Sequence, residues 1–241
     1  MIVALLSAID YPRDRLSVVF CEGGSKDQTA EKLSQLVAAH KARFRSITVI
    51  NSDCKNALDQ STRWLPQLQF ERRSNLARVR NRLADAGISD DTHWALWIDA
   101  DVCDYDPGIV RRLIAARAEV VTPDCVRDWD GPSYDLNAFN DDGELRNHAY
   151  YKHVKAGLYM PPADRRTRRH LHVFRFLDRV PLSSVGGTML LVHASVHQAG
   201  IRFPEIPYDH LLETEGFGRI CRDFGIQPFG LPNLQIKHVK S

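Results

Sequence analysis

The stretch Trp94-Ala95-Leu96-Trp97-Ile98-Asp99-Ala100-Asp101-Val102 carries the strongest fold signal in the chain. Its apolar first half is typical of a central strand covered on both faces of a sheet. Because residues two apart in an extended chain point the same way, Asp99 and Asp101 can face one point just past the strand. Ligands of open α/β sheets bind at that edge. Two carboxylates converging there predict a divalent cation, and oxygen ligands suit Mg²⁺ or Mn²⁺.

The Asp-x-Asp spacing alone is weak, because the chain contains two further triplets of this kind. Asp104 and Asp106 lead into a proline, and we interpret them as loop and helix-cap residues. Asp128 and Asp130 stand beside a Gly-Pro pair, and we interpret them as turn residues. Only the pair that begins with Asp99 ends an apolar strand, and that context favours it as a binding site.

Composition sets broad limits on function. The 241 residues are 44% hydrophobic and 26% charged, as is usual for a globular protein. The formal net charge of +2 gives no argument for binding nucleic acid or a membrane surface. An apolar run of about 18 residues, which a membrane span requires, is absent from the sequence. The five cysteines form no C-x-x-C pair, so we expect reduced thiols in a reducing compartment and no zinc site.

Helical and strand patterns alternate along the chain and predict an α/β domain. We expect one domain over 1–241 with a mostly parallel central sheet and helices on both faces, divided into a nucleotide-binding half, 1–125, and an acceptor-side half, 126–241. The expected helices cover residues 1–9, 29–41, 72–86, 107–116, 193–200 and 211–224. The expected strands cover residues 16–21, 47–50, 94–98, 119–121, 188–192 and 234–239, with a turn at 230–233.

The periodic pattern is lost over residues 126–176, which are polar and rich in Asp, Asn, Arg and Tyr. A loop region of this length inside a domain is usually functional or mobile. Its basic run at 165–170 is interpreted first as a solvated face, and alternatively as a contact to an acceptor or a phosphate.

The turn from Glu22 to Thr29 joins the end of an expected strand to the start of a helix. Gly23 and Gly24 let the backbone approach a ligand closely, and a helix N-terminus favours anions. Asp27 could instead cap the helix. The turn is expected beside Asp99, on the same edge of the sheet.

Other charged residues have both a structural and a functional interpretation. Either Arg78 or Arg80, on the helix before the Asp99 strand, could reach a pyrophosphate, or they face solvent. Glu213 and Glu215 open a helix, where carboxylates favour the dipole, and one could also serve a sugar hydroxyl or a reacting centre. His238 is a lone histidine on a strand, but a carboxylate pair that needs a third ligand gives it a role in metal binding.

Several motifs together resemble the fungal mannan-polymerase subunit family, whose members are GT-A glycosyltransferases of glycosyltransferase family 62. The resemblance covers about residues 11–238 and keeps the order of the motifs. They are Glu22-Gly-Gly-Ser-Lys-Asp-Gln-Thr29, Arg78-Val-Arg-Asn81, Trp97-Ile-Asp-Ala-Asp-Val102, Val185-Gly-Gly-Thr188, Glu213-Thr-Glu-Gly-Phe217 and Gly230-Leu-Pro-Asn233 with His238.

The resemblance implies a GT-A-like nucleotide-sugar-binding fold and retaining α-mannosyl transfer from GDP-mannose with Mn²⁺ (or Mg²⁺). By similarity, Asp99 and Asp101 belong to the D-x-D and His238 is the C-terminal metal-binding histidine. Glu213 and Glu215 are the catalytic candidates, because one of them could position the acceptor or stabilise the cationic sugar. The donor-binding candidates are Glu22, Gly23, Gly24, Asp27, Arg78, Arg80, Asp99, Gly186 and Gly187. The implied partners are a nucleotide-sugar donor, a glycan acceptor and a partner glycosyltransferase subunit, with no nucleic acid.

Two features depart from the family. Its members carry an N-terminal membrane anchor, and their catalytic domain opens with a strand before the helix found here at Met1. We therefore expect the first strand of the fold to be missing, the strand at 16–21 to show an open edge, and an upstream segment to supply the strand. The location is expected to be cytoplasmic for the sequence as written, and the Golgi membrane if an anchor precedes it.

Two other functions remain open. A phosphatase of the haloacid dehalogenase type also has an apolar strand followed by D-x-D-x-[TV], although its later G-D-x-x-x-D is not found here. A non-catalytic subunit that scaffolds a partner transferase would fit the missing strand, but it would have no use for a metal triad. Hydrolysis of a chromogenic phosphate ester tests the first, and GDP release by the purified protein tests the second.

Overall fold

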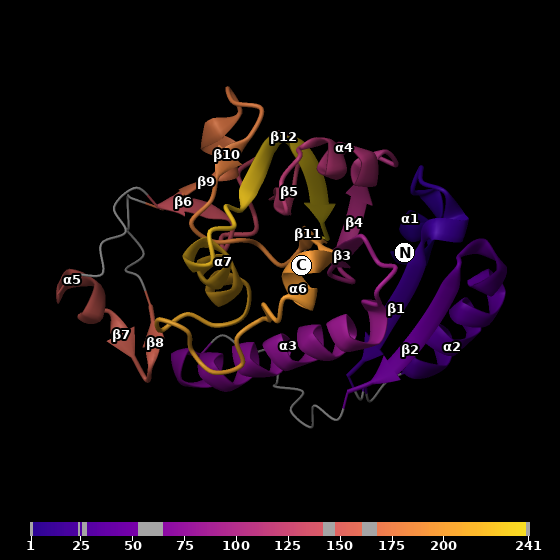
Figure 1. Cartoon of the computed structure of the whole chain (residues 1–241), viewed down its shortest axis with the longest axis horizontal. Helices are drawn as coiled ribbons and strands as arrows, with labels where there is room; N and C mark the ends of the chain where they lie inside the picture. Colours follow the sequence, from indigo (N-terminus) through magenta and orange to yellow (C-terminus); the bar gives the residue numbers. More distant parts are fainter. Residues whose placement is uncertain are drawn as a thin grey trace.

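The computed structural model describes residues 2–23, 25, 28–52, 65–141, 148–160 and 168–239. Figure 1 shows a central sheet with helices on either side and a second, smaller sheet near the N-terminus. The helices are α1 (Ile2–Ala8), η1 (Arg13–Arg15), α2 (Thr29–His40), η2 (Lys41–Arg43), α3 (Pro66–Gly87), α4 (Ile109–Ala115), α5 (His148–Tyr151), η3 (Leu171–Phe174), α6 (Ala194–Gln198) and α7 (Glu213–Asp223). The strands are β1 (Ser17–Glu22), β2 (Ser46–Asn51), β3 (Trp94–Ile98), β4 (Val102–Tyr105), β5 (Val120–Val126), β6 (Phe139–Asp141), β7 (Val154–Lys155), β8 (Leu158–Tyr159), β9 (Arg168–His170), β10 (Val180–Pro181), β11 (Met189–His193) and β12 (Phe229–His238).

The main sheet has six strands in the order β10-β12-β5-β11-β3, with β4 paired to β12. β1 and β2 form a separate parallel pair, and β6-β9 and β7-β8 form two short antiparallel pairs. Only the β12–β5 ladder of the main sheet is parallel, and its other four are antiparallel. The sheet is therefore mixed, and the expectation of a mostly parallel sheet is wrong in this respect.

The strand directions bring several chain segments to one edge of the main sheet. β11 runs antiparallel to both β3 and β5, and β12 runs parallel to β5. β3, β5 and β12 therefore point the same way, and their carboxyl ends lie at one edge. Asp99 follows β3, Arg127 follows β5 and His238 ends β12. β4 begins at this edge as well, because Val102 pairs with His238.

Alternate residues of β11 enter two different cores, as the period of two in a strand requires. Met189 and Leu191 pack with residues of α1 and α4 on one face of the sheet. Leu190 and Val192 pack with residues of α3, α6 and α7 on the other face. The expected cover of helices on both faces is confirmed.

Three local expectations are corrected by the structure. β3 lies at the end of the main sheet, and only Trp97 among its residues is buried, so it is not the doubly covered central strand that its apolar sequence suggests. Residues 230–233 do not form a separate turn, because β12 continues through them with a register shift between Leu231 and Gln235. Helix α3 begins at Pro66, earlier than expected, since proline at the first turn suits a helix start.

The sequence predicts an open edge along β1. Among the described strands, β1 pairs only with β2, and β3 pairs only with β11. Within the described residues, no strand therefore lies along the other edge of β1. No helix of the described ranges is both long and apolar enough to cross a membrane.

Candidate active site

The candidate metal ligands come from two chain segments at the shared sheet edge, the Asp99–Asp101 turn and the end of β12. Nε2 of His238 lies 2.8 Å from Oδ2 of Asp101, so strand β12 brings the histidine onto the second carboxylate. The backbone N–H of Asp99 donates to the carbonyl of Thr188, which fixes the start of the Asp99–Asp101 turn against β11. Two of the three residues thus already meet.

The third candidate, Asp99, is engaged by an arginine. Nη2 of Arg80 donates to Oδ1 of Asp99 over 3.1 Å, and Nε of Arg80 donates to Oε1 of Glu213 over 3.2 Å. Arg80 also donates to the carbonyl of Gly187. The buried guanidinium thereby links helix α3 to the D-x-D turn, the glycine pair and helix α7, which are far apart in sequence.

Burial shifts the pKa values of the groups that Arg80 joins. Loss of solvation raises the pKa of Asp99 to about 6, with Arg80 opposing the rise and the carboxylates of Glu213 and Asp101 adding to it. Burial alone would lower the pKa of Arg80, but Asp99 and Glu213 outweigh it and raise that pKa. Arg80 therefore remains a cation, and 42% of the Asp99 side-chain surface still faces solvent.

The donor atoms of Asp99, Asp101 and His238 fit a divalent cation in kind but not yet in arrangement. Two carboxylates and one imidazole are a suitable set for Mn²⁺, and the contact between Asp101 and His238 aims two of them at each other. Within the part of the chain that the structure describes, however, no group of three such side chains is arranged to hold a metal. The physical reason is that Asp99 faces Arg80, so a three-ligand site requires its carboxylate to turn away from the guanidinium.

Glu213 and Glu215 open helix α7, as expected, and both are buried. Glu213 has a φ of 52°, which is strained for a residue with a side chain and is typical of functional sites. Glu215 accepts from Arg73 over 3.0 Å and from Arg168 over 3.1 Å. Burial would raise the pKa of Glu215, but the two arginines outweigh it and hold that pKa below its usual value.

The glycine pair Gly186-Gly187 serves contacts within the protein. The N–H groups of Gly187 and Thr188 both donate to Oδ2 of Asp135, over 2.9 and 3.1 Å. A Cβ on Gly186 would overlap the carboxylate of Asp135, and one on Gly187 would lie 2.6 Å from Nη2 of Arg80. These glycines are therefore required for the close approach of Asp135 and Arg80, and a donor contact remains a prediction.

The strand–turn–helix at the end of β1 is described in part. Glu22 is buried, and its carboxylate accepts from the N–H of Ser25 over 2.7 Å, so it stabilises the turn. A Cβ on Gly23 would meet no atom of the described residues within 4 Å, so the backbone there is not covered by them. Gly24 and Asp27 lie outside the described residues.

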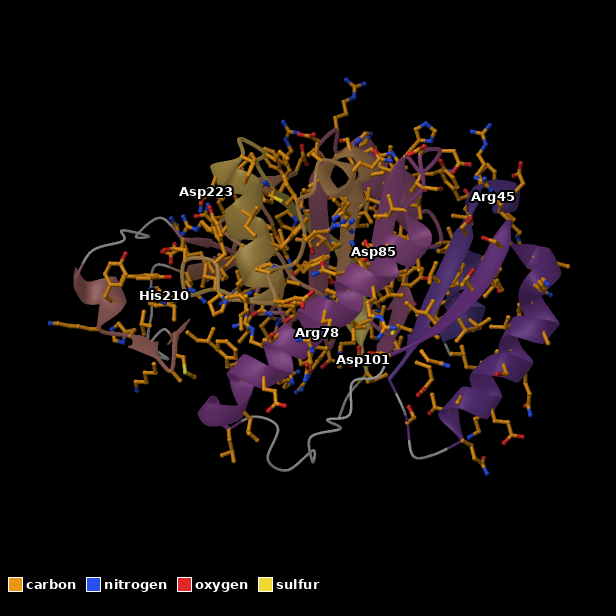
Figure 2. The ribbon with its side chains drawn as sticks, turned by 60° about the horizontal axis from the view of Figure 1, so that its bottom comes forward. Arg45, Arg78, Asp85, Asp101, His210 and Asp223 are labelled. Atoms are coloured by element: carbon orange, nitrogen blue, oxygen red, sulfur yellow. The ribbon has the colours of Figure 1, made fainter. Side chains whose placement is uncertain are left out.

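The two arginines proposed for a pyrophosphate have different surroundings. Arg78 projects from α3 at the surface (Figure 2), and its Nε pairs with Glu205 over 3.3 Å. Arg80, two residues further on, is buried between Asp99 and Glu213. The sequence left the choice between them open, and the structure places only Arg80 in contact with the D-x-D turn.

Several residues of this region were not found from the sequence. Asp135 and Tyr134 lie in the aperiodic segment, where no pattern marks them, and Arg73 gave no signal beyond its place on a helix. Arg168 belongs to the basic run that was interpreted as a solvated face, which is wrong for this residue, since only 12% of its side chain is exposed. Residues 165–167 of that run lie outside the described part. Asp106 accepts from the N–H of Gly108 in the turn before α4, but the N-cap of that helix is Gly108 and no side chain caps it, so the cap interpretation is wrong. Asp104 lies in β4 and not in a loop.

Comparison with known proteins identifies the family. The family model described as Anp1 matches residues 1–207. The chain belongs to the Anp1 family. It is 29% identical over 250 residues to the mannan polymerase complex subunit mnn9 of Schizosaccharomyces pombe, covering 97% of this chain and 74% of the relative. It is 28% identical over 253 residues to the mannan polymerase II complex ANP1 subunit of Saccharomyces cerevisiae, covering 97% of this chain and 51% of the relative. The resemblance to mannan-polymerase subunits is confirmed.

Solved structures similar to this Anp1-family chain establish its fold. It superimposes on mannosyltransferase PcManGT from Pyrobaculum calidifontis in complex with GDP-Man and Mn²⁺, with a TM-score of 0.54, 13% identity and coverage of 98% of this chain and 51% of that one. GalNAc-T7 with UDP, GalNAc and Mn²⁺ gives a TM-score of 0.55 at 12% identity, covering 95% of this chain and 39% of that one. The fold is that of GT-A glycosyltransferases, and it gives the phosphatase alternative no support.

Proposed function

We propose that this protein is a cation-dependent glycosyltransferase that moves a hexose, mannose from GDP-mannose, to a glycan acceptor with retention at the transferred carbon. The observation that carries the proposal is the meeting of Asp101 with His238, beside Asp99, at the carboxyl edge of a GT-A sheet. The relatives named as mannan polymerase subunits support mannose as the sugar.

In this proposal Asp99, Asp101 and His238 hold Mn²⁺ or Mg²⁺ together with the donor diphosphate. The bound cation supplies positive charge that stabilises the departing nucleotide. Nε2 of His238 already contacts Asp101. To bind the cation, Asp99 would have to give up its hydrogen bond from Arg80. Arg80 would keep its contact to Glu213 during this exchange, so the guanidinium would remain paired while Asp99 turns.

The donor nucleotide is proposed to lie against the turn after β1, with the candidates Glu22, Gly23, Gly24 and Asp27. The space that the described residues leave beside Gly23 supports this placement, because a ligand could approach the backbone there. Arg78 is the candidate for a direct phosphate contact, since its side chain is half-exposed and 37% of its present partner, Glu205, also faces solvent. Arg80 is assigned a positioning role.

The two carboxylates of α7 are proposed to act differently. Glu213 shares Arg80 with Asp99 and so lies nearer to the proposed reaction centre, where its charge would stabilise a cationic sugar. Glu215 is enclosed by Arg73 and Arg168, and it would hold the start of α7 in place. A retaining front-face transfer needs no protein nucleophile, and none is assigned.

A second proposal concerns assembly. The relatives are named as subunits of mannan polymerase complexes, which supports a partner glycosyltransferase subunit for this chain as well. A location at the Golgi membrane would follow from the family resemblance if an N-terminal anchor is present. Assembly and catalysis are compatible, since a subunit with an intact site can transfer sugar within a complex.

Thermal unfolding with a panel of nucleotide-sugars tests the donor assignment. We expect GDP-mannose to raise the unfolding midpoint only in the presence of Mn²⁺, because binding to the native state alone stabilises it. UDP-glucose serves as the control donor. GDP release by the purified protein then separates an enzyme from a scaffold, and a complete lack of donor binding would contradict the proposal.

A further inference from the structure

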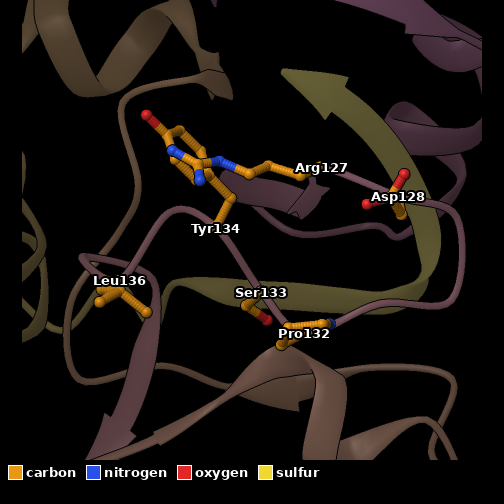
Figure 3. Close-up of a pocket in the computed structure, with 6 residues that line it drawn as sticks. All are labelled: Arg127, Asp128, Pro132, Ser133, Tyr134 and Leu136. Carbon is orange, nitrogen blue, oxygen red and sulfur yellow. The ribbon is translucent and has the colours of Figure 1, made fainter. Parts of the chain in front are cut away.

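A cleft of about 460 Å³ opens next to the candidate active site, within the segment that joins β5 to β6 (Figure 3). It is lined by Arg127, Asp128, Pro132, Ser133, Tyr134 and Leu136. None of these residues belongs to the proposed donor, metal or catalytic set. The proposed function therefore assigns no ligand to the cleft.

Two contacts connect the cleft to the reaction centre. The ring of Tyr134 lies 4.2 Å from the ring of His238, whose Nε2 contacts Asp101. The next residue, Asp135, accepts from the N–H groups of Gly187 and Thr188. A ligand that contacts Tyr134 would thus be separated from the D-x-D turn by two side chains, those of Tyr134 and His238.

The cleft wall is fixed by hydrogen bonds, two of which end on the buried carboxylate of Asp124. Oγ of Ser133 donates to Oδ1 of Asp124 over 2.6 Å, and Arg175 donates to the other oxygen of Asp124 over 3.1 Å. Arg175 also donates to the carbonyls of Asp130 and Gly131. A wall tied in this way needs little ordering on binding, which favours affinity for a small ligand.

The chemistry of the lining favours a neutral ligand with both polar and apolar faces. Pro132 and Leu136 are exposed apolar side chains, and 58% of Leu136 faces solvent. Arg127 and Asp128 carry opposite charges at the same cleft, so it has no net attraction for an anion such as a phosphate. Figure 3 shows the guanidinium of Arg127 over the Tyr134 ring, at 4.6 Å from its centroid. A pyranose offers C–H groups to the apolar side chains and hydroxyls to the charged ones.

We infer that this cleft binds a saccharide unit of the acceptor glycan, adjacent to the unit that receives the transferred hexose. The inference rests on the proposed function, since it gives the acceptor a place on the β5–β6 side of the metal site. The proposed donor turn follows β1, in the separate two-stranded sheet, so donor and acceptor would approach from different sheets.

The test is the affinity of a mannose oligosaccharide for the wild-type protein and for Leu136→Ser, measured by titration calorimetry with GDP and Mn²⁺ present. Losing the apolar contact should weaken binding about ten-fold, and the acceptor KM should rise by a similar factor. The donor KM and the slow hydrolysis of donor without acceptor should not change. Phe224→Ser is the matched control, since it removes another exposed apolar side chain, at the end of α7.

Because Leu136 is exposed, Leu136→Ser should fold normally, and Pro132→Ser is a second lining variant with the same expected effect. Weakened oligosaccharide binding in both variants would support acceptor binding in the cleft. If the protein released no GDP, that result would refute the proposed function but not acceptor binding in the cleft. Sugar transfer with an unchanged acceptor KM in both variants would refute acceptor binding in the cleft, and the proposed function would still hold. Failure of the wild-type protein to bind any oligosaccharide would also refute acceptor binding in the cleft.

Discussion

The imidazole of His238 lies 2.8 Å from the carboxylate of Asp101, although one residue ends β12 and the other precedes β4. The antiparallel pairing of these two strands holds them together. We predict that Asp101→Asn abolishes the Mn²⁺-dependent part of GDP binding while the protein remains folded, because half of the Asp101 side chain is exposed. Titration calorimetry with and without Mn²⁺ measures this change.

Asp104→Asn is the matched control for this substitution. Asp104 belongs to another Asp-x-Asp triplet and lies within β4, so it should keep full cation dependence. Equal losses in the two variants, or full cation-dependent binding in Asp101→Asn, would remove Asp101 from the metal site.

Arg80 is predicted to matter for folding far more than its neighbour Arg78. Arg80→Met would leave the buried carboxylate of Glu213 without its cation, at a cost of about 3–5 kcal/mol in the free energy of unfolding. Asp99 would add little to this cost, since 42% of its side chain is exposed. Arg78→Met removes only a surface pair with Glu205 and should cost about 1 kcal/mol or less. Urea unfolding of both variants measures the difference, and similar losses would contradict the bridging role of Arg80.

Glu215 provides a test by pH. Its pKa in the folded protein is held below the ordinary value of 4.5, since the attraction of Arg73 and Arg168 exceeds the effect of burial. A carboxyl group of this kind contributes stability above its unfolded pKa and loses it as the pH falls through the folded value. Glu215→Gln should therefore destabilise the protein most near neutral pH, and the difference from wild type should shrink below pH 4.5.

The free energy of unfolding of both proteins, measured from pH 7 down to about pH 3, checks the sign of this effect. A gap between wild type and variant that stays constant over the range would mean that the ion pairs of Glu215 contribute nothing to folding.

Gly23 allows the donor site to be tested without disturbing the fold. A Cβ at this position meets no atom within 4 Å in the part of the chain that the structure describes, so Gly23→Val should leave the unfolding midpoint near that of wild type. If the turn after β1 lines the donor pocket, the added bulk should weaken GDP binding about ten-fold, with little effect on Mn²⁺ affinity. Unchanged GDP affinity would place the nucleotide elsewhere.

Much of the edge that carries the site could be predicted from the sequence. An apolar strand that ends in Asp99 and Asp101 requires both carboxylates to leave at its carboxyl end, and the strand with His238 was expected nearby. The sheet is mixed because β11 runs antiparallel between β3 and β5. The spacing of apolar residues predicts a strand but does not indicate its direction relative to its neighbours. The low burial of β3 has the same kind of cause, since an apolar run does not reveal whether a neighbouring strand is present.

The side-chain contacts within the site could not be predicted, because they depend on tertiary structure. Arg80 was one of two arginines on a helix, and only the packing of α3 against α7 shows that it joins Asp99 to Glu213. Gly186 and Gly187 suggested a ligand-binding turn, but the groups that approach them in the described structure are the carboxylate of Asp135 and the guanidinium of Arg80. Asp135 itself lies in a segment without periodicity, so nothing in its neighbourhood singled it out.

Sugar transfer by the purified protein tests the central claim most directly. The protein is mixed with GDP-mannose and a mannose oligosaccharide, with Mn²⁺ or with a chelator, and mass spectrometry of the acceptor is combined with an assay for GDP. We predict that the acceptor gains one hexose per GDP released, that the chelator stops both, and that Asp101→Asn does the same. GDP release and hexose addition that continue at full rate in the presence of the chelator, or in Asp101→Asn, would contradict the account.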